Sequence, residues 1–188
     1  MLYQIVSLLL DVVAGLVGGA CLLRLYMQYQ RIPMSAHSGN PLGSFVFTLT
    51  DWLVLPLRRV LPAAGKLDTA SLLAVYLIEL AQFGLLWLLA GAKTPLPVIF
   101  VLAFFGMFRL AISLATGLLI VNIVLSWVQT HSPLADLIER LCAPALAPVR
   151  RIVPPIGGLD LSALVLLLLL QVAAIVLAGI QTSVLQVL

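Results

Sequence analysis

The stretch "PLRRVLP" at residues 56–62 decides the fold, because the chain repeats it almost unchanged as "PVRRIVP" at residues 148–154. The repetition keeps one spacing across several residue types and continues downstream of the motif. Six residues recur 92 positions later: Pro56, Arg58, Arg59, Pro62, Gly65 and Asp68 return as Pro148, Arg150, Arg151, Pro154, Gly157 and Asp160. A shared spacing of this kind indicates an internal duplication.

The composition places both copies in a membrane. Of the 188 residues, 63% are hydrophobic and only 9% are charged, whereas about a quarter of the residues in a soluble domain are charged. The net charge of +3 comes from few side chains, so it indicates orientation across a bilayer rather than binding to nucleic acid. We therefore expect the lipid bilayer, including anionic lipids, as a partner and no nucleic acid.

Four apolar stretches are long enough to cross a bilayer, which needs about 20 residues. We predict an all-α polytopic membrane protein with spans at about 3–29, 69–92, 104–128 and 162–185. The first stretch has no basic side chain before its apolar run, which favours a retained span over a signal peptide. Pro95 and Pro97 predict a broken or tilted entry to the third span rather than one overlong helix.

Two amphipathic helices are expected between the spans, at about 41–55 and 133–147. Phe45, Leu49 and Trp52 recur at helical spacing in the first, which suits a helix lying in the membrane interface or re-entering the bilayer. In the second, Pro144 and Pro148 are expected to bend or end the helix. The chain thus divides into halves at 1–92 and 93–188, each a span, an amphipathic helix and a span.

The orientation follows from the repeat and from the basic residues. Each half contains two spans, so both halves enter the membrane in the same direction, as parallel repeats with a twofold axis along the membrane normal. Most Lys and Arg side chains lie on the two long connections. The positive-inside rule therefore predicts cytoplasmic connections and both termini outside.

Charged and amide side chains inside the spans are the first candidates for a site, because such groups are usually paired or functional. Arg24 and Glu79 correspond in the repeat to Asn122 and Gln171, at offsets of 98 and 92. We hypothesise an Arg24–Glu79 pair and an uncharged Asn122–Gln171 counterpart. Such pairs either hold the helices together or form an ion or proton relay, and the sequence leaves both readings open.

A second pair of charges, Asp11 and Arg109, also lies 98 positions apart. Small residues flank both positions, in the small-xxx-small pattern that lets membrane helices approach closely: Gly15, Gly19, Ser113 and Gly117. We predict that the first and third spans pack here, with Asp11 facing Arg109.

The repeated motif itself has two readings. Arg58, Arg59, Arg150 and Arg151 form either a cytoplasmic surface for anionic lipid or a partner protein, or an anchor that orients the next span. The prolines, glycines and aspartates around them mark the turn and the re-entry into the bilayer. The sequence contains no nucleophile, phosphate-loop or zinc-protease motif, so we expect no catalytic, metal or cofactor site.

Both copies, "NPLGSFVFTLTDWLVLPLRRVLPAAGKLDTASLL" and "SPLADLIERLCAPALAPVRRIVPPIGGLDLSALV", resemble the YggT family of bacterial inner-membrane proteins. The resemblance implies a role in osmotic-stress tolerance, in cell division or nucleoid organisation, or, as in plastids, in cytochrome b6f assembly. It carries over no catalytic residue. We expect a non-enzymatic scaffold or assembly factor that binds other membrane proteins or itself. The alternative is a small ion or solute channel or transporter for osmotic adjustment.

Overall fold

The computed structural model describes residues 1–34, 40–61, 68–92, 95–128, 132–152 and 161–187. Within these ranges it contains no strand and six helices: α1 (Leu2–Tyr29), α2 (Pro41–Val60), α3 (Thr69–Leu89), α4 (Leu96–Val128), α5 (Pro133–Arg150) and α6 (Leu161–Val187). Four of them, α1, α3, α4 and α6, are long and apolar enough to cross a membrane. The all-α prediction is confirmed for the described chain.

The two shorter helices begin in the same way, with a polar cap followed by proline. The Asn40 side chain accepts a hydrogen bond from the backbone N–H of Leu42 at 3.0 Å, and Ser132 accepts one from Ala135 at 3.2 Å. The missing N–H of a proline costs little at the start of a helix, where it would have no intrahelical partner. The "NP" and "SP" pairs are therefore helix starts.

The broken entry to the third span does not occur. α4 is one helix of 33 residues that begins at Leu96, well before the expected position 104. Pro97 lies in its first turn, where the absent N–H breaks no hydrogen bond and the fixed φ of proline suits a helix.

The first part of each repeated motif also lies within a helix. α2 runs through Pro56 to Val60, and α5 runs through Pro144 and Pro148 to Arg150, past the expected ends at 55 and 147. These prolines occupy exposed positions, where water or lipid headgroups can hydrate the carbonyl that each ring leaves unpaired. The motif arginines therefore lie near the last carbonyls of each helix, where positive charge is favourable.

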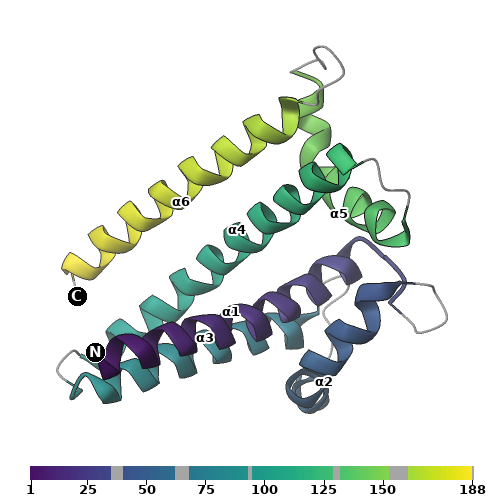
Figure 1. Cartoon of the computed structure of the whole chain (residues 1–188). Helices are drawn as coiled ribbons and strands as arrows, with labels where there is room; N and C mark the ends of the chain where they lie inside the picture. Colours follow the sequence, from purple (N-terminus) through teal and green to yellow (C-terminus); the bar gives the residue numbers. More distant parts are fainter. Residues whose placement is uncertain (35–39, 62–67, 93–94, 129–131, 153–160, 188) are drawn as a thin grey trace.

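Helix α1 is central to the packing, since it contacts α2, α3 and α4 (Figure 1). One apolar cluster joins α1, α2 and α3 around Cys21, Val54 and Ala74. A second cluster joins α1 to the second half of the chain through Met27, Leu141, Leu146, Leu119 and Ala163. The two halves therefore share a core.

The last helix is the least covered. α6 packs chiefly beside α4 and α5, and 6% of its most apolar window is buried, against 28% for α1. The two chain ends lie together at the end of the molecule opposite α2 and α5 (Figure 1). Almost the whole length of α6 is thus available to lipid or to another protein.

Candidate functional site

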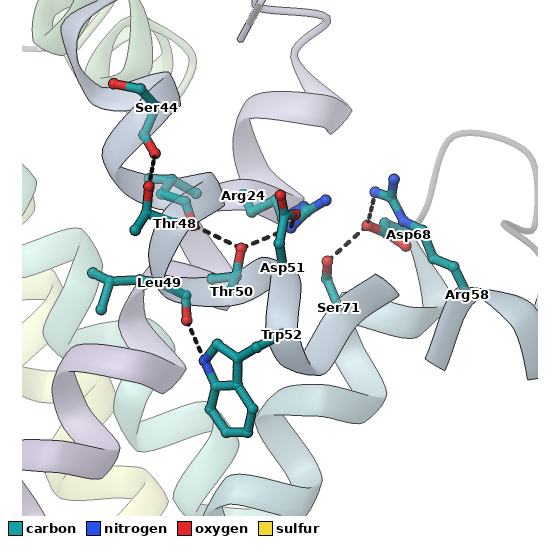
Figure 2. Close-up of polar contacts among 11 residues, drawn as sticks. Arg24, Ser44, Thr48, Leu49, Thr50, Asp51, Trp52, Arg58, Asp68 and Ser71 are labelled. Atoms are coloured by element: carbon teal, nitrogen blue, oxygen red, sulfur yellow. Dashed lines mark hydrogen bonds and ion pairs between the residues drawn. The ribbon is translucent and has the colours of Figure 1, made fainter. Parts of the chain in front are cut away.

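A buried arginine joins α1 to α2. The Arg24 side chain is 2% exposed, and its Nη1 donates hydrogen bonds to Thr50 Oγ1 and Asp51 Oδ1, both at 2.7 Å (Figure 2). Its Cζ lies 4.8 Å from the centroid of the Phe47 ring, a favourable cation–π distance. The Arg24 Nε is buried with no hydrogen-bond partner.

The hypothesised Arg24–Glu79 pair does not form in the structure, because Arg24 turns to α2 instead. The Arg24–Glu79 hypothesis included only side chains that lie inside the spans. Asp51 on the amphipathic helix is the better partner, because its side chain is 40% exposed and stays hydrated. Only one of the two charges then bears a full desolvation penalty.

A second polar cluster joins the ends of α1, α2 and α3. Arg58 Nη2 donates to Asp68 Oδ2 at 2.5 Å, and Ser71 Oγ donates to the same oxygen at 2.7 Å (Figure 2). With its amide in the orientation that suits both neighbours, Gln28 completes the cluster: its nitrogen donates to Asp68 Oδ2 at 2.9 Å, and its oxygen accepts from Arg58 at 2.6 Å. Three side chains thus converge on Asp68 Oδ2, whereas Asp68 Oδ1 is buried with no hydrogen-bond partner.

Asp68 is the buried member of this cluster, with 2% of its side chain exposed. Burial by itself would raise the pKa of Asp68, but hydrogen bonds from Arg58 and Ser71 and the Arg58 charge outweigh it, so the pKa lies below its usual value. The aspartate that the sequence analysis assigned to re-entry is therefore an ionised anchor for the start of α3.

The four motif arginines do not form one surface. Arg58 is directed to Asp68, while Arg59, Arg150 and Arg151 are exposed. The C-terminal ends of α2 and α5 lie at opposite edges of the molecule (Figure 1). The remaining turn and re-entry residues lie outside the described part of the chain: Pro62, Gly65, Pro154, Gly157 and Asp160.

Glu79 lies at the middle of α3, ten residues from either end. It is 3% exposed, and its Oε2 is buried with no hydrogen-bond partner. Gly106 of α4 lies directly against it, so that a Cβ atom added to this glycine would overlap the carboxylate. The contact of α3 with α4 at Gly106 thus buries a carboxyl oxygen, Glu79 Oε2, that has no hydrogen-bond donor.

Asp11 and Arg109 flank this carboxyl group but do not pair with each other. Gln82 Nε2 donates to Asp11 Oδ1, and the Arg109 guanidinium lies over the Phe83 ring, with Cζ 5.7 Å from its centroid. Both charges act electrostatically on Glu79. The expected Asp11–Arg109 contact is replaced by contacts of each residue with α3.

The first and third spans do pack together, although not at the expected glycines. A Cβ atom at Gly18 would lie 2.7 Å from Leu110 Cδ2 of α4, whereas Cβ atoms at Gly15, Gly19 and Gly117 would meet nothing within 4 Å. The small-xxx-small pattern therefore predicted a close approach of the helices but not the residue that makes it.

In the second half, Asn122 and Gln171 were expected to form an uncharged pair. Asn122 is partly buried and Gln171 is exposed, and the structure gives no hydrogen bond between these two described residues. Helix α5 receives polar contacts from α1: Tyr26 Oη and Gln30 Nε2 donate to the Leu141 carbonyl at 2.8 and 3.2 Å.

The sequence analysis also missed the inner face of α2. Phe45 and Trp52 are 59% and 66% exposed, as suits side chains that contact lipid. The buried face is a separate row of Val46, Thr50 and Val54. These residues recur every fourth position, and this spacing was the signal that could have identified Thr50, and with it the partner of Arg24.

The chain contains a long helix, a short helix and a long helix in this order, twice. The match to a known family falls into two segments that correspond to these halves. A family model described as CCB3/YggT matches residues 3–89 and again residues 98–181. The chain belongs to the CCB3/YggT family. The uncharacterized protein YggT of Escherichia coli K12 is 35% identical over 88% of this chain and 85% of its own length. No solved structure matches this YggT-family chain.

A second relative extends this family assignment. A Vibrio alginolyticus protein, described as an uncharacterized protein in the proC 3' region, is 36% identical over 81% of the chain and 82% of its own length. The names of these relatives state no activity, so the relatives support the family assignment and no particular role.

Proposed function

We propose that this YggT-family protein is a non-enzymatic scaffold or assembly factor of the bacterial inner membrane. The observation that carries the proposal is the bare surface of α6. Leu168 and Ile175 on this helix are 66% and 72% exposed, and few of its residues are covered by the rest of the chain. Such a helix can pack against another membrane protein without rearrangement of its own bundle.

The topology that we propose is two parallel repeats with α2 and α5 at the cytoplasmic surface and both termini outside. The repeated helix order and the double family match support this arrangement, as does the location of both chain ends opposite α2 and α5. The exposed arginines of the two helices would then face lipid headgroups or a cytoplasmic partner. By resemblance, the complex served is one of osmotic-stress tolerance, cell division or membrane-complex assembly.

Photo-crosslinking in native membranes tests the scaffold proposal. A photoreactive residue placed at Ile175 should crosslink to a discrete membrane protein that also copurifies with the chain. The same residue at Leu9 on α1, which is 57% exposed, is the matched control and should label lipid. Lipid adducts alone at both positions would reject the scaffold.

The second candidate is a small ion or solute channel or transporter. The buried Glu79 at the middle of α3 favours it, because charged groups at this depth often mark ion or proton pathways. Purified protein in liposomes would then conduct an ion or solute, and Glu79→Gln would abolish the flux. A tight bilayer with the wild-type protein would reject transport.

A further inference from the structure

We infer that the Glu79 carboxyl group, set against Gly106 between α3 and α4, is an intramembrane proton-binding site. This goes beyond the scaffold proposal and does not depend on it, because a carboxyl group can hold an exchangeable proton whether or not the protein binds a partner. It also holds whether or not the protein transports anything.

The first step is the absence of any donor to the Glu79 Oε2. This atom is buried and has no hydrogen-bond partner, in a side chain that is 3% exposed. A carboxylate removed from water without donors costs several kcal/mol, and such a group takes up a proton instead. The only atoms that face it from Gly106 are those of the backbone, since this residue has no side chain.

The second step is the contrast with Asp11, the carboxyl group that α1 directs to the same region. Asp11 is exposed and accepts a hydrogen bond from Gln82, three residues after Glu79 on α3. Asp11 Oδ1 thus has a hydrogen-bond donor, whereas Glu79 Oε2 has none. A buried carboxyl oxygen without a donor favours the protonated form, so we place the proton on Glu79.

The third step concerns the other charges that face Glu79. Arg109 on α4 acts on it electrostatically but lies over Phe83 and gives Glu79 no hydrogen bond. The negative charge of Asp11 opposes that of Arg109. Helix α2 also packs against α3. Its ion pair there joins Arg58 to Asp68 at the N-terminal end of α3, away from Glu79. Among the described residues, no hydrogen-bond donor therefore stabilises a charge on Glu79 Oε2.

Labelling with dicyclohexylcarbodiimide, an apolar reagent, tests this site directly in the whole protein. The reagent takes the carboxyl proton on nitrogen, the carboxylate oxygen adds to its central carbon, and rearrangement leaves a stable N-acylurea. The reaction therefore requires a protonated acid in apolar surroundings. Protein in liposomes should carry the adduct on the Glu79 peptide at neutral pH, and labelling should fall about tenfold per pH unit once the proton is lost.

Two variants give opposite results if Asp11 and Arg109 act as argued. At a fixed pH, Asp11→Asn should reduce Glu79 labelling severalfold and Arg109→Gln should increase it, because they remove charges of opposite sign. Glu79→Gln should lose the adduct completely.

The wild-type pH series decides the question even if a variant fails to fold. Absence of a Glu79 adduct at every pH, or labelling that does not fall as the pH rises, would overturn the inference. Suppression of labelling by Na⁺ or K⁺ in place of choline would assign the site to an alkali cation and would also overturn it.

Discussion

At Arg24, a guanidinium that is 2% exposed is held by two groups of α2, one of which is an aspartate that is 40% exposed. Breaking the pair therefore has different consequences for the two side chains. Without Asp51, the buried Arg24 charge keeps only Thr50 as a hydrogen-bond acceptor among the described residues. Without Arg24, Asp51 is hydrated and Thr50 still donates to the Val46 carbonyl at 2.7 Å.

This asymmetry predicts that Asp51→Leu lowers the free energy of unfolding more than Arg24→Met does. We expect about 2 kcal/mol for Asp51→Leu, below the usual cost of breaking a fully buried pair because the aspartate is partly hydrated. Thermal melting in detergent measures the difference, with the exposed Asp136 of α5 changed to Leu as the matched control. Equal melting temperatures for the Asp51 and Asp136 variants would contradict the prediction.

Asp68 gives a prediction that depends on pH. Because the pKa of Asp68 in the folded protein lies below its ordinary value of 3.8, its stabilising contribution is complete above that value. It is lost as the pH falls through the folded pKa. Asp68→Asn should therefore destabilise the protein by about 2 kcal/mol near neutrality, and the difference from wild type should shrink below pH 3.8.

Two adjacent arginines test this cluster, with Arg59 as the matched control for Arg58. Arg58→Gln should destabilise the protein because it removes the bond to Asp68, whereas Arg59→Gln at an exposed position should have little effect. A wild-type advantage over Asp68→Asn that persists unchanged in acid would show that the aspartate does not act through its charge.

At the scale of elements, two of the contacts between long helices are made at a glycine. α1 meets α4 at Gly18 and α3 meets α4 at Gly106. Other glycines of the same helices face open space. A glycine therefore matters for helix packing when it faces a neighbouring helix. Its place in a small-xxx-small pattern does not by itself identify it.

Gly106→Ala should weaken the crossing of α3 and α4. The added methyl group would overlap the Glu79 carboxylate and lie 3.2 Å from the Phe83 ring, and overpacking of this kind costs about 1 to 3 kcal/mol. Gly117→Ala on the same helix meets nothing within 4 Å and should be neutral or stabilising, since alanine favours a helix. Melting curves that rank the two variants the other way would contradict the crossing.

At the scale of the whole molecule, the two halves have the same order of long, short and long helices. The first half is joined by charged and amide side chains at the ends of α1, α2 and α3. Helix α5 of the second half is held by an apolar cluster and by hydrogen bonds from α1. Helix α1 thus connects the two halves.

The proposed orientation predicts the accessibility of single cysteines. An impermeant maleimide added to spheroplasts should label a cysteine at exposed Ala92, after α3, and should reach one at exposed Val60 only after the membrane is permeabilised. Native labelling should be low, because Cys21 and Cys142 are buried and burial raises the pKa of the Cys142 thiol to about 11. A cysteine at Ile152 should behave like that at Val60, and the reverse pattern would invert the topology.

Much of the architecture could be predicted from local patterns. The four spans follow from the length of apolar runs, and the starts of α2 and α5 follow from "NP" and "SP". The C-terminal ends of α2 and α5 could not be predicted in the same way. Pro56, Pro144 and Pro148 lie inside these helices, because the carbonyl groups that they leave without a hydrogen bond lie outside the core.

The sequence by itself determined the long apolar helices and the order of the elements, because hydrophobic length and helix caps are properties of neighbouring residues. Only the tertiary structure decided that Arg24 binds Asp51, that Arg58 binds Asp68, and that Glu79 Oε2 has no donor. The reason is that a helix that is apolar all round carries no periodic pattern to mark its inner face, so its rotation about its own axis cannot be read from the sequence. The direction in which each polar side chain points is therefore set by how the helices pack.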